Sequence, residues 1–334
     1  MTVSPTRQPS RRSAPVPAAS GAGGSETSTG FESSPQRLRR VLRTRPAETR
    51  VQLTLSRIGQ LFRADEYPRI LAEAASGAQS PVTTGRRIAV VGSRGGAGKT
   101  TVAALLARTY ASLRADTVTA VDNSVGAGTL GLRLGFTGAP SLADLAHSLN
   151  GQTPSSLADL AARLGAAESN LLVAGGAATA SPPGAGADDD AARAARAVSR
   201  FCPITILDCG TGMELPSTSW AIQQSHAAIF VTPATVAGLE DARRYAEQWN
   251  GAGSDAAIPL LTLVLQTDAR NPVDAVEEAE RLSHHGTVAV ALPYDRHLAG
   301  GVELDLGLLS RASLLTSTTV ASRILLAATG KAKP

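Results

Sequence analysis

Residues Ile88 to Thr101 read IAVVGSRGGAGKTT: four apolar residues, a glycine-rich run, then a lysine and two threonines. The apolar run predicts a buried strand, and the Ala- and Leu-rich segment Thr100–Leu113 predicts a helix. Glycines between a strand and a helix let backbone N–H groups curl around an oxyanion, and the helix N-terminus adds positive partial charge. The stretch therefore predicts a phosphate-binding loop.

The side chains of this loop indicate nucleotide chemistry. A lysine here can reach β- and γ-phosphates, and the following hydroxyl can ligate Mg²⁺. A glycine-rich turn that merely joins two elements is the alternative, which the order strand, glycines, Lys-Thr and helix disfavours. We expect the nucleotide phosphates to bind the following residues: Gly95, Gly96, Ala97, Gly98, Lys99, Thr100 and Thr101.

Short apolar runs alternate with longer Ala- and Leu-rich segments through the rest of the chain. Near-continuous apolar strands separated by helices predict an α/β fold with a doubly wound, mostly parallel sheet flanked by helices. The expected strands are 88–91, 118–121, 171–174, 204–207, 227–231, 260–265 and 287–291. The expected helices include 100–113, 189–198, 236–249 and 272–282, with a last helix over 310–329 that packs on the sheet.

Charge divides the 334 residues into a basic arm and a mildly acidic body. Residues 1–87 carry 14 arginines and 6 acidic residues, a net charge of +8, and the other 247 carry 18 basic and 22 acidic residues, a net charge of −4. Residues 1–35 are rich in Ser, Pro and Gly, so we expect them to be disordered. We expect 36–86 to be a basic, partly helical extension and linker, and 87–330 to be the nucleotide-binding domain.

Composition also excludes several classes of protein. Aromatic residues make up only 3%, which disfavours a stacking surface for single-stranded nucleic acid. Two cysteines exclude a disulfide scaffold or a Cys-rich zinc module. No run reaches the ~18 apolar residues of a spanning helix, and residues 1–30 lack a signal-peptide core. We therefore expect a soluble, cytoplasmic protein.

The loop resembles one branch of the P-loop proteins. Ser93 stands where the pattern GxxxxGK[ST] has its first glycine, and RGGAGKTT at 94–101 resembles the deviant Walker A motif of the MinD/ParA ATPases. In that family a lysine at the position of Arg94 reaches across a dimer to the partner's nucleotide. The resemblance implies this role for Arg94, which keeps the charge; a solvated loop arginine is the alternative. It covers Arg87 to about Gly330.

Two strand ends extend the resemblance. VTAVDNS at 118–124 resembles the strand that leads into switch I, with Asp122 at its first aspartate and Ser124 where a second aspartate usually positions the attacking water. Serine can hold a water but cannot act as a carboxylate base, so slow or absent hydrolysis is an alternative. ITILDCGTG at 204–212 resembles the Walker B strand and switch II, which implies that Asp208 holds Mg²⁺.

The resemblance also implies an adenine site at strand ends, where open α/β sheets bind nucleotides. Gln266 follows the expected strand 260–265. Pro293 and Tyr294 lie in a stretch that resembles the late P-x-D loop of the family.

The resemblance implies a nucleotide-controlled switch. Such a protein would be a homodimer in the ATP state, dissociated by hydrolysis, that positions or regulates a cargo such as a chromosome, plasmid, division site or secretion system. The expected catalytic residues are Lys99, Arg94, Asp122 and Ser124; the expected Mg²⁺ ligands are Thr100 and Asp208. Actinobacterial type VII secretion accessories share the Arg-rich extension. A nucleotide-binding scaffold with little hydrolysis is the first alternative, and a metabolic enzyme of the same fold ranks last.

The arm leaves its target open. Its densest basic cluster consists of Arg37, Arg39, Arg40, Arg43 and Arg45. These arginines can neutralise DNA phosphates or anionic lipid, which would place the protein at the nucleoid or the membrane surface. Folding on a protein partner or activator and a merely solubilising tail are the other interpretations.

Overall fold

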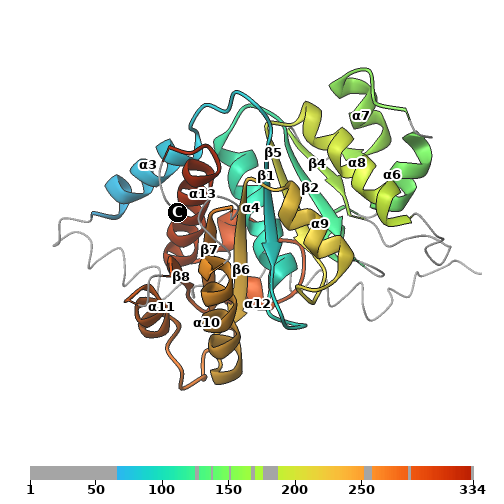
Figure 1. Cartoon of the computed structure of the whole chain (residues 1–334). Helices are drawn as coiled ribbons and strands as arrows, with labels where there is room; N and C mark the ends of the chain where they lie inside the picture. The colour runs from blue at the N-terminus through green and yellow to red at the C-terminus, as the bar shows by residue number, and fades with distance from the viewer. Residues whose placement is uncertain are drawn as a thin grey trace, which may run out of the picture.

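A mostly parallel sheet forms the centre of the molecule (Figure 1). The computed structural model describes residues 66–124, 128–136, 138–149, 152–166, 170–175, 187–251, 258–284 and 287–331. The strand order is β3-β4-β2-β5-β1-β6-β7-β8, and every neighbouring pair is parallel except β3 and β4. The strands are β1 Arg86–Val91, β2 Val118–Asn123, β3 Gly165–Ala166, β4 Leu171–Ala174, β5 Ile204–Cys209, β6 Ala227–Pro233, β7 Leu260–Leu265 and β8 Ala289–Leu292.

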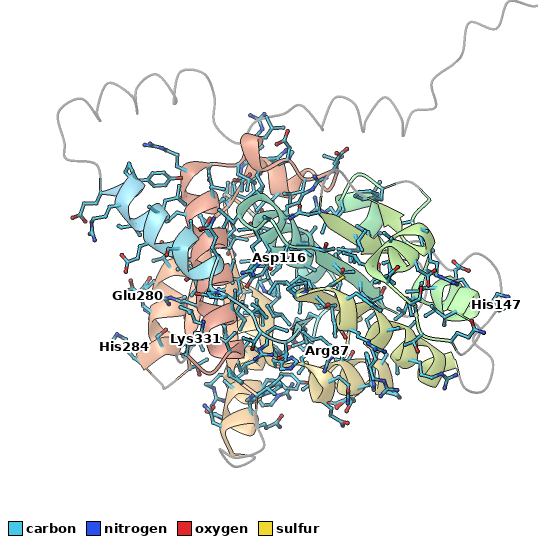
Figure 2. All side chains as sticks on the ribbon, turned by 90° about the horizontal axis from the view of Figure 1, so that it is seen from above. Arg87, Asp116, His147, Glu280, His284 and Lys331 are labelled. Carbon is cyan, nitrogen blue, oxygen red and sulfur yellow. The ribbon has the colours of Figure 1, made fainter. Side chains whose placement is uncertain are left out.

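Helices cover both faces of this sheet, as the view from above shows (Figure 2). Strand side chains alternate between the faces: Ile88 and Val90 pack toward α4 and α13, whereas Ala89 and Val91 pack toward the layer that contains α6 and α8. The helices are α3 Tyr67–Ala78, α4 Lys99–Leu113, α5 Leu130–Arg133, α6 Leu142–Leu149, α7 Leu157–Arg163, α8 Ala187–Phe201, α9 Pro216–Gln224, α10 Val236–Gly251, α11 Ala275–His284, α12 Arg296–Ala299, the 3₁₀ turn η1 Leu306–Leu308, and α13 Arg311–Ala328.

The predicted doubly wound α/β architecture is confirmed, with small differences at element ends. Strand β1 begins at Arg86, two residues before the apolar run, because the Arg86 N–H donates to Pro203 O at 2.8 Å. Backbone pairing does not depend on side-chain polarity, so an apolar pattern marks a strand's end poorly. The last strand runs over 289–292 instead of 287–291.

The last helix, α13, packs on the sheet, as predicted, and α3 packs against it. The Tyr110 hydroxyl of α4 donates to Ala321 O of α13 at 2.6 Å inside the core. Gly77 of α3 lies so close to α13 that a Cβ there would be 1.9 Å from Ser322 Oγ. The described part of the basic extension is therefore in close contact with the body.

The predicted disorder of 1–35 and the arginine cluster at 37–45 lie outside the described residues. The domain limits at 35, 86 and 330 stay predictions. Within the described segments, no helix has the length and apolar character needed to cross a membrane.

Candidate functional site

The predicted phosphate loop connects β1 to α4 at the carboxyl ends of the central strands. Gly96 and Gly98 have φ angles of +72° and +98°, a region that favours glycine. A Cβ on Gly92 would lie 2.6 Å from Val231 O, so the backbone approaches its neighbour closely. Helix α4 begins after Gly98 with no side-chain cap in the described part of the chain, which leaves its first N–H groups available to an anion.

Lys99 is buried and ties this loop to the segment after β5. Its Nζ donates to Arg94 O at 2.9 Å and to Thr211 Oγ1 at 3.0 Å. The Gly212 N–H donates to Gly92 O at 3.4 Å. Burial lowers the pKa of Lys99, while Asp208 and Cys209 act to raise it. Thr211 lies within the motif at 204–212 but is not among the predicted site residues, because one threonine in a glycine loop has no distinguishing pattern.

Two buried carboxylates lie side by side at the ends of β2 and β5, where Asp122 pairs in register with Asp208. The Thr100 side chain hydrogen-bonds Asp208, whose Oδ1 is buried with no partner among the described residues. Burial, and secondarily Asp122, raise the pKa of Asp208 to about 8, against Thr100 and Lys99, which lower it.

This donor set fits a hard cation, because an unsatisfied carboxylate oxygen beside a hydroxyl is the kind of site that Mg²⁺ takes. The described residues contain no cluster of three or more His, Cys, Asp or Glu side chains that would hold a metal alone. An Mg²⁺ held by Thr100 and Asp208 would therefore take its other ligands from phosphate and water.

Ser124 is engaged with the neighbouring carboxylate. Its hydroxyl and its N–H both donate to Asp122 Oδ1, the latter at 3.0 Å. The Leu130 N–H donates to Asp122 Oδ2 at 3.3 Å. Burial nevertheless raises the pKa of Asp122, the three bonds acting against it. The hydroxyl expected to hold a water thus orients Asp122 in this structure.

Arg94 points toward α10. Its Nε donates to Asp241 Oδ2 at 2.7 Å, and Ser93 Oγ donates to the same oxygen at 2.9 Å. Arg244 reaches Asp241 Oδ1 at 3.2 Å. Burial acts to raise the pKa of Asp241, but Ser93 and the two arginines outweigh it and hold that pKa below its ordinary value. Asp241 is a partner that sequence reasoning missed, since it lies almost 150 residues away.

A cavity of about 230 Å³ adjoins the loop and brings distant predicted residues together. It is lined by Gly96, Gly98, Thr101, Arg133, Leu265, Gln266, Thr267, Leu292, Pro293, Tyr294, Asp295, Leu298 and Ala299. All three residues predicted to contact adenine are among them. The Gln266 side chain is held by its surroundings: its Oε1 accepts from the Ala275 N–H at 3.1 Å and its Nε2 donates to Asp268 O at 3.1 Å.

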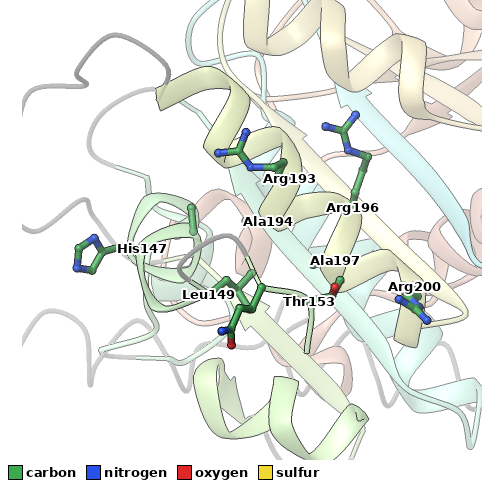
Figure 3. Close-up of a pocket in the computed structure, with 10 residues that line it drawn as sticks. His147, Leu149, Thr153, Arg193, Ala194, Arg196, Ala197 and Arg200 are labelled. Atoms are coloured by element: carbon green, nitrogen blue, oxygen red, sulfur yellow. The ribbon is translucent and has the colours of Figure 1, made fainter. Parts of the chain in front are cut away.

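A larger cleft lies away from the loop, between α6 and α8 (Figure 3). Its volume is about 700 Å³, and Arg193, Arg196 and Arg200 of α8 line it. None of the predicted site residues does. The cavity beside the phosphate loop is therefore the candidate site, because the loop, the carboxylates and the predicted base contacts meet there.

Known proteins resemble this chain in part of its sequence and in its fold. No family model matches the chain. The chain is 32% identical over 229 residues to the ESX-1 secretion-associated protein EspI of Mycobacterium tuberculosis; the match covers 67% of this chain and 34% of EspI, so the chain spans about a third of that relative's length.

Two solved structures have a similar fold. One is a ParA family ATPase from Chlorobium tepidum, with TM-score 0.57 and 18% identity over 71% of this chain and 98% of that one. The other is the septum site-determining protein MinD from Pyrococcus horikoshii, complexed with Mg-ADP, with TM-score 0.55 and 22% identity over 75% of this chain and 100% of that one. These likenesses show the fold.

Proposed function

We propose that this chain, which has the fold of the ParA/MinD ATPases, is an ATP-binding and hydrolysing switch that forms a homodimer in its ATP state and positions or regulates a cargo. The observation that carries the proposal is the convergence of Lys99, Thr100 and the buried pair Asp122 and Asp208 at one end of a parallel sheet, beside a cavity. Each group matches a requirement of phosphoryl transfer.

Each residue of the site has its own role in the proposed binding and hydrolysis of ATP. The loop N–H groups and Lys99 bind the phosphates and neutralise the charge of the transferring group. Thr100 and Asp208 would hold Mg²⁺, which when bound supplies further neutralisation of phosphate charge. Asp122 and Ser124 would orient the attacking water. Arg94, once released from Asp241, would reach the partner's nucleotide across the dimer.

Phosphate release from the purified full chain tests the activity. We expect slow ATP turnover that disappears in Lys99→Ala, because the buried ammonium donates to the loop backbone and would neutralise phosphate charge there. Lys331→Ala is the matched control, since that lysine is exposed and its Nζ donates to Pro81 O at 3.3 Å instead of to the loop. Turnover that persists in Lys99→Ala would contradict the assignment.

Light scattering tests the switch. We expect a monomer with ADP and a dimer with a non-hydrolysable ATP analogue. A monomer with both ligands would refute the ATP-dependent homodimer.

A nucleotide-binding scaffold with little or no hydrolysis is the second candidate, and the bond from Ser124 to Asp122 favours it. The usual second aspartate is replaced by a serine whose hydroxyl is already used. ATP binding without measurable phosphate release would favour the scaffold. Ser124→Asp then discriminates further, because it should raise turnover only if hydrolysis is limited by this position.

The likeness to EspI supports placement at a secretion system as the class of cargo. We propose that the protein acts in the cytoplasm, with the arginine cluster at 37–45 as its contact to a protein partner, DNA or anionic lipid. Gel shift and vesicle co-sedimentation, with and without residues 1–65, separate these targets. Binding that is unchanged without those residues would overturn the role of the arm.

A further inference from the structure

Arg133, at the end of α5, places a buried positive charge on the wall of the candidate nucleotide cavity. Arg133 is only 8% exposed and lines the cavity. The guanidinium donates to the Thr101 hydroxyl, to Leu298 O at 3.0 Å and to Val302 O at 3.1 Å. All three acceptors are neutral. No carboxylate of the described residues pairs with Arg133, and burial alone lowers its pKa.

A buried cation without a counter-ion is costly, since desolvation is not offset by an ion pair. The site adds to that cost, because Thr101 lies in the first turn of α4, whose positive dipole end repels a cation. An anion in the cavity would remove both penalties at once. Arg108 of α4 shows the contrast: it bonds Leu134 O at 2.7 Å and lies 3.7 Å from the Glu303 carboxylate.

The position of Arg133 defines which part of a ligand it would meet. Thr101 belongs to the phosphate-loop end of the cavity, and Leu298 of α12 lies beside the end formed by Pro293 and Tyr294. Arg133 bonds to both residues and therefore lies between these two ends of the cavity. In a bound nucleotide, the sugar and the phosphate attached to it lie between the base and the terminal phosphates. ADP and ATP both carry this sugar-proximal phosphate.

We propose that Arg133 binds the sugar-proximal phosphate of the nucleotide and sets the affinity of the site for ADP and ATP alike. The inference rests on the proposed nucleotide-binding function and adds a residue that the phosphate-loop pattern does not contain. Arg133 acts on binding, whereas Lys99 also serves the transferring group.

Titration calorimetry of the full chain with ADP and with a non-hydrolysable ATP analogue tests it. We expect Arg133→Met to weaken both ligands by the same factor, about 10- to 100-fold, the loss typical of a hydrogen bond to a charged group. Raising salt should weaken ADP binding less steeply in the variant than in the wild type, since one charge contact is gone. Arg108→Met, the matched control, should bind both ligands as the wild type does.

Three results would overturn the inference: wild-type affinity in Arg133→Met, an equal loss in Arg108→Met, or a loss confined to the ATP analogue. If Arg133→Met does not fold, Arg133→Lys carries the test, because it keeps the charge and loses the fork; an equal, smaller loss for both ligands supports the inference, and unchanged affinity refutes it. A wild type that binds neither nucleotide is a different outcome, which refutes the proposed function itself.

Discussion

The contact between Arg94 and Asp241 yields a quantitative prediction for the proposed dimer. Arg94 cannot both hold Asp241 at 2.7 Å and reach a partner's nucleotide. Forming the ATP dimer must therefore break this contact. Removing the carboxylate charge in advance, by Asp241→Asn, should favour the dimer.

The magnitude follows from the burial of the two partners. The Arg94 side chain is 46% exposed and that of Asp241 is 12% exposed. Exposed ion pairs contribute about 0 to 1 kcal/mol, and charge-assisted hydrogen bonds away from water about 1.5 to 3 kcal/mol. An intermediate value is about 1 to 2 kcal/mol per protomer. A symmetric dimer loses the contact twice, so about 2 to 4 kcal/mol, a factor of roughly 30 to 900, enters the dimer equilibrium.

Sedimentation equilibrium with a non-hydrolysable ATP analogue measures this equilibrium. We expect a roughly 30- to 900-fold tighter dimer for Asp241→Asn. Glu240→Gln is the control, because Glu240 lies on the same helix and pairs with Arg243 instead. The double variant Arg94→Ala and Asp241→Asn should dimerise as Arg94→Ala alone. A dimer of unchanged or lower affinity in Asp241→Asn would refute the reasoning.

Three further predictions concern the phosphate loop, the buried carboxylate and the packing of α3 on α13. Gly98→Ala should abolish nucleotide binding in calorimetry, since φ is +98° and a Cβ would lie 2.5 Å from Leu265 Cδ2; binding like the wild type would contradict the loop geometry. Urea unfolding should show that Asp208→Asn gains stability relative to the wild type as pH rises from about 4 to about 8. The raised pKa of about 8 makes the folded wild type bind a proton that the unfolded chain has released over this range. A pH-independent difference would show that the carboxyl titrates normally. Gly77→Leu should lower the thermal midpoint by several degrees, about 1 to 3 kcal/mol for overpacking against Ser322, and no change would mean that α3 leaves α13 without loss.

The sequence by itself determined the parallel architecture and the place of the phosphate loop. Buried strands of a parallel sheet must be apolar on both faces, so the runs at 88–91 and 204–207 are visible without any partner. Glycine, lysine and threonine in the loop are required by local backbone geometry and phosphate contact. Such local demands appear as consecutive residues.

Only the tertiary structure decided which distant groups complete the site. Asp241 holds Arg94 from α10, Thr211 contacts Lys99 from the segment after the neighbouring strand β5, and Arg133 enters the cavity wall from α5. These contacts join residues 32 to 147 positions apart, as in the bonds from Arg133 to Thr101 and from Arg94 to Asp241. Their partners are chosen by strand order and helix packing, which side-chain periodicity along the chain does not encode.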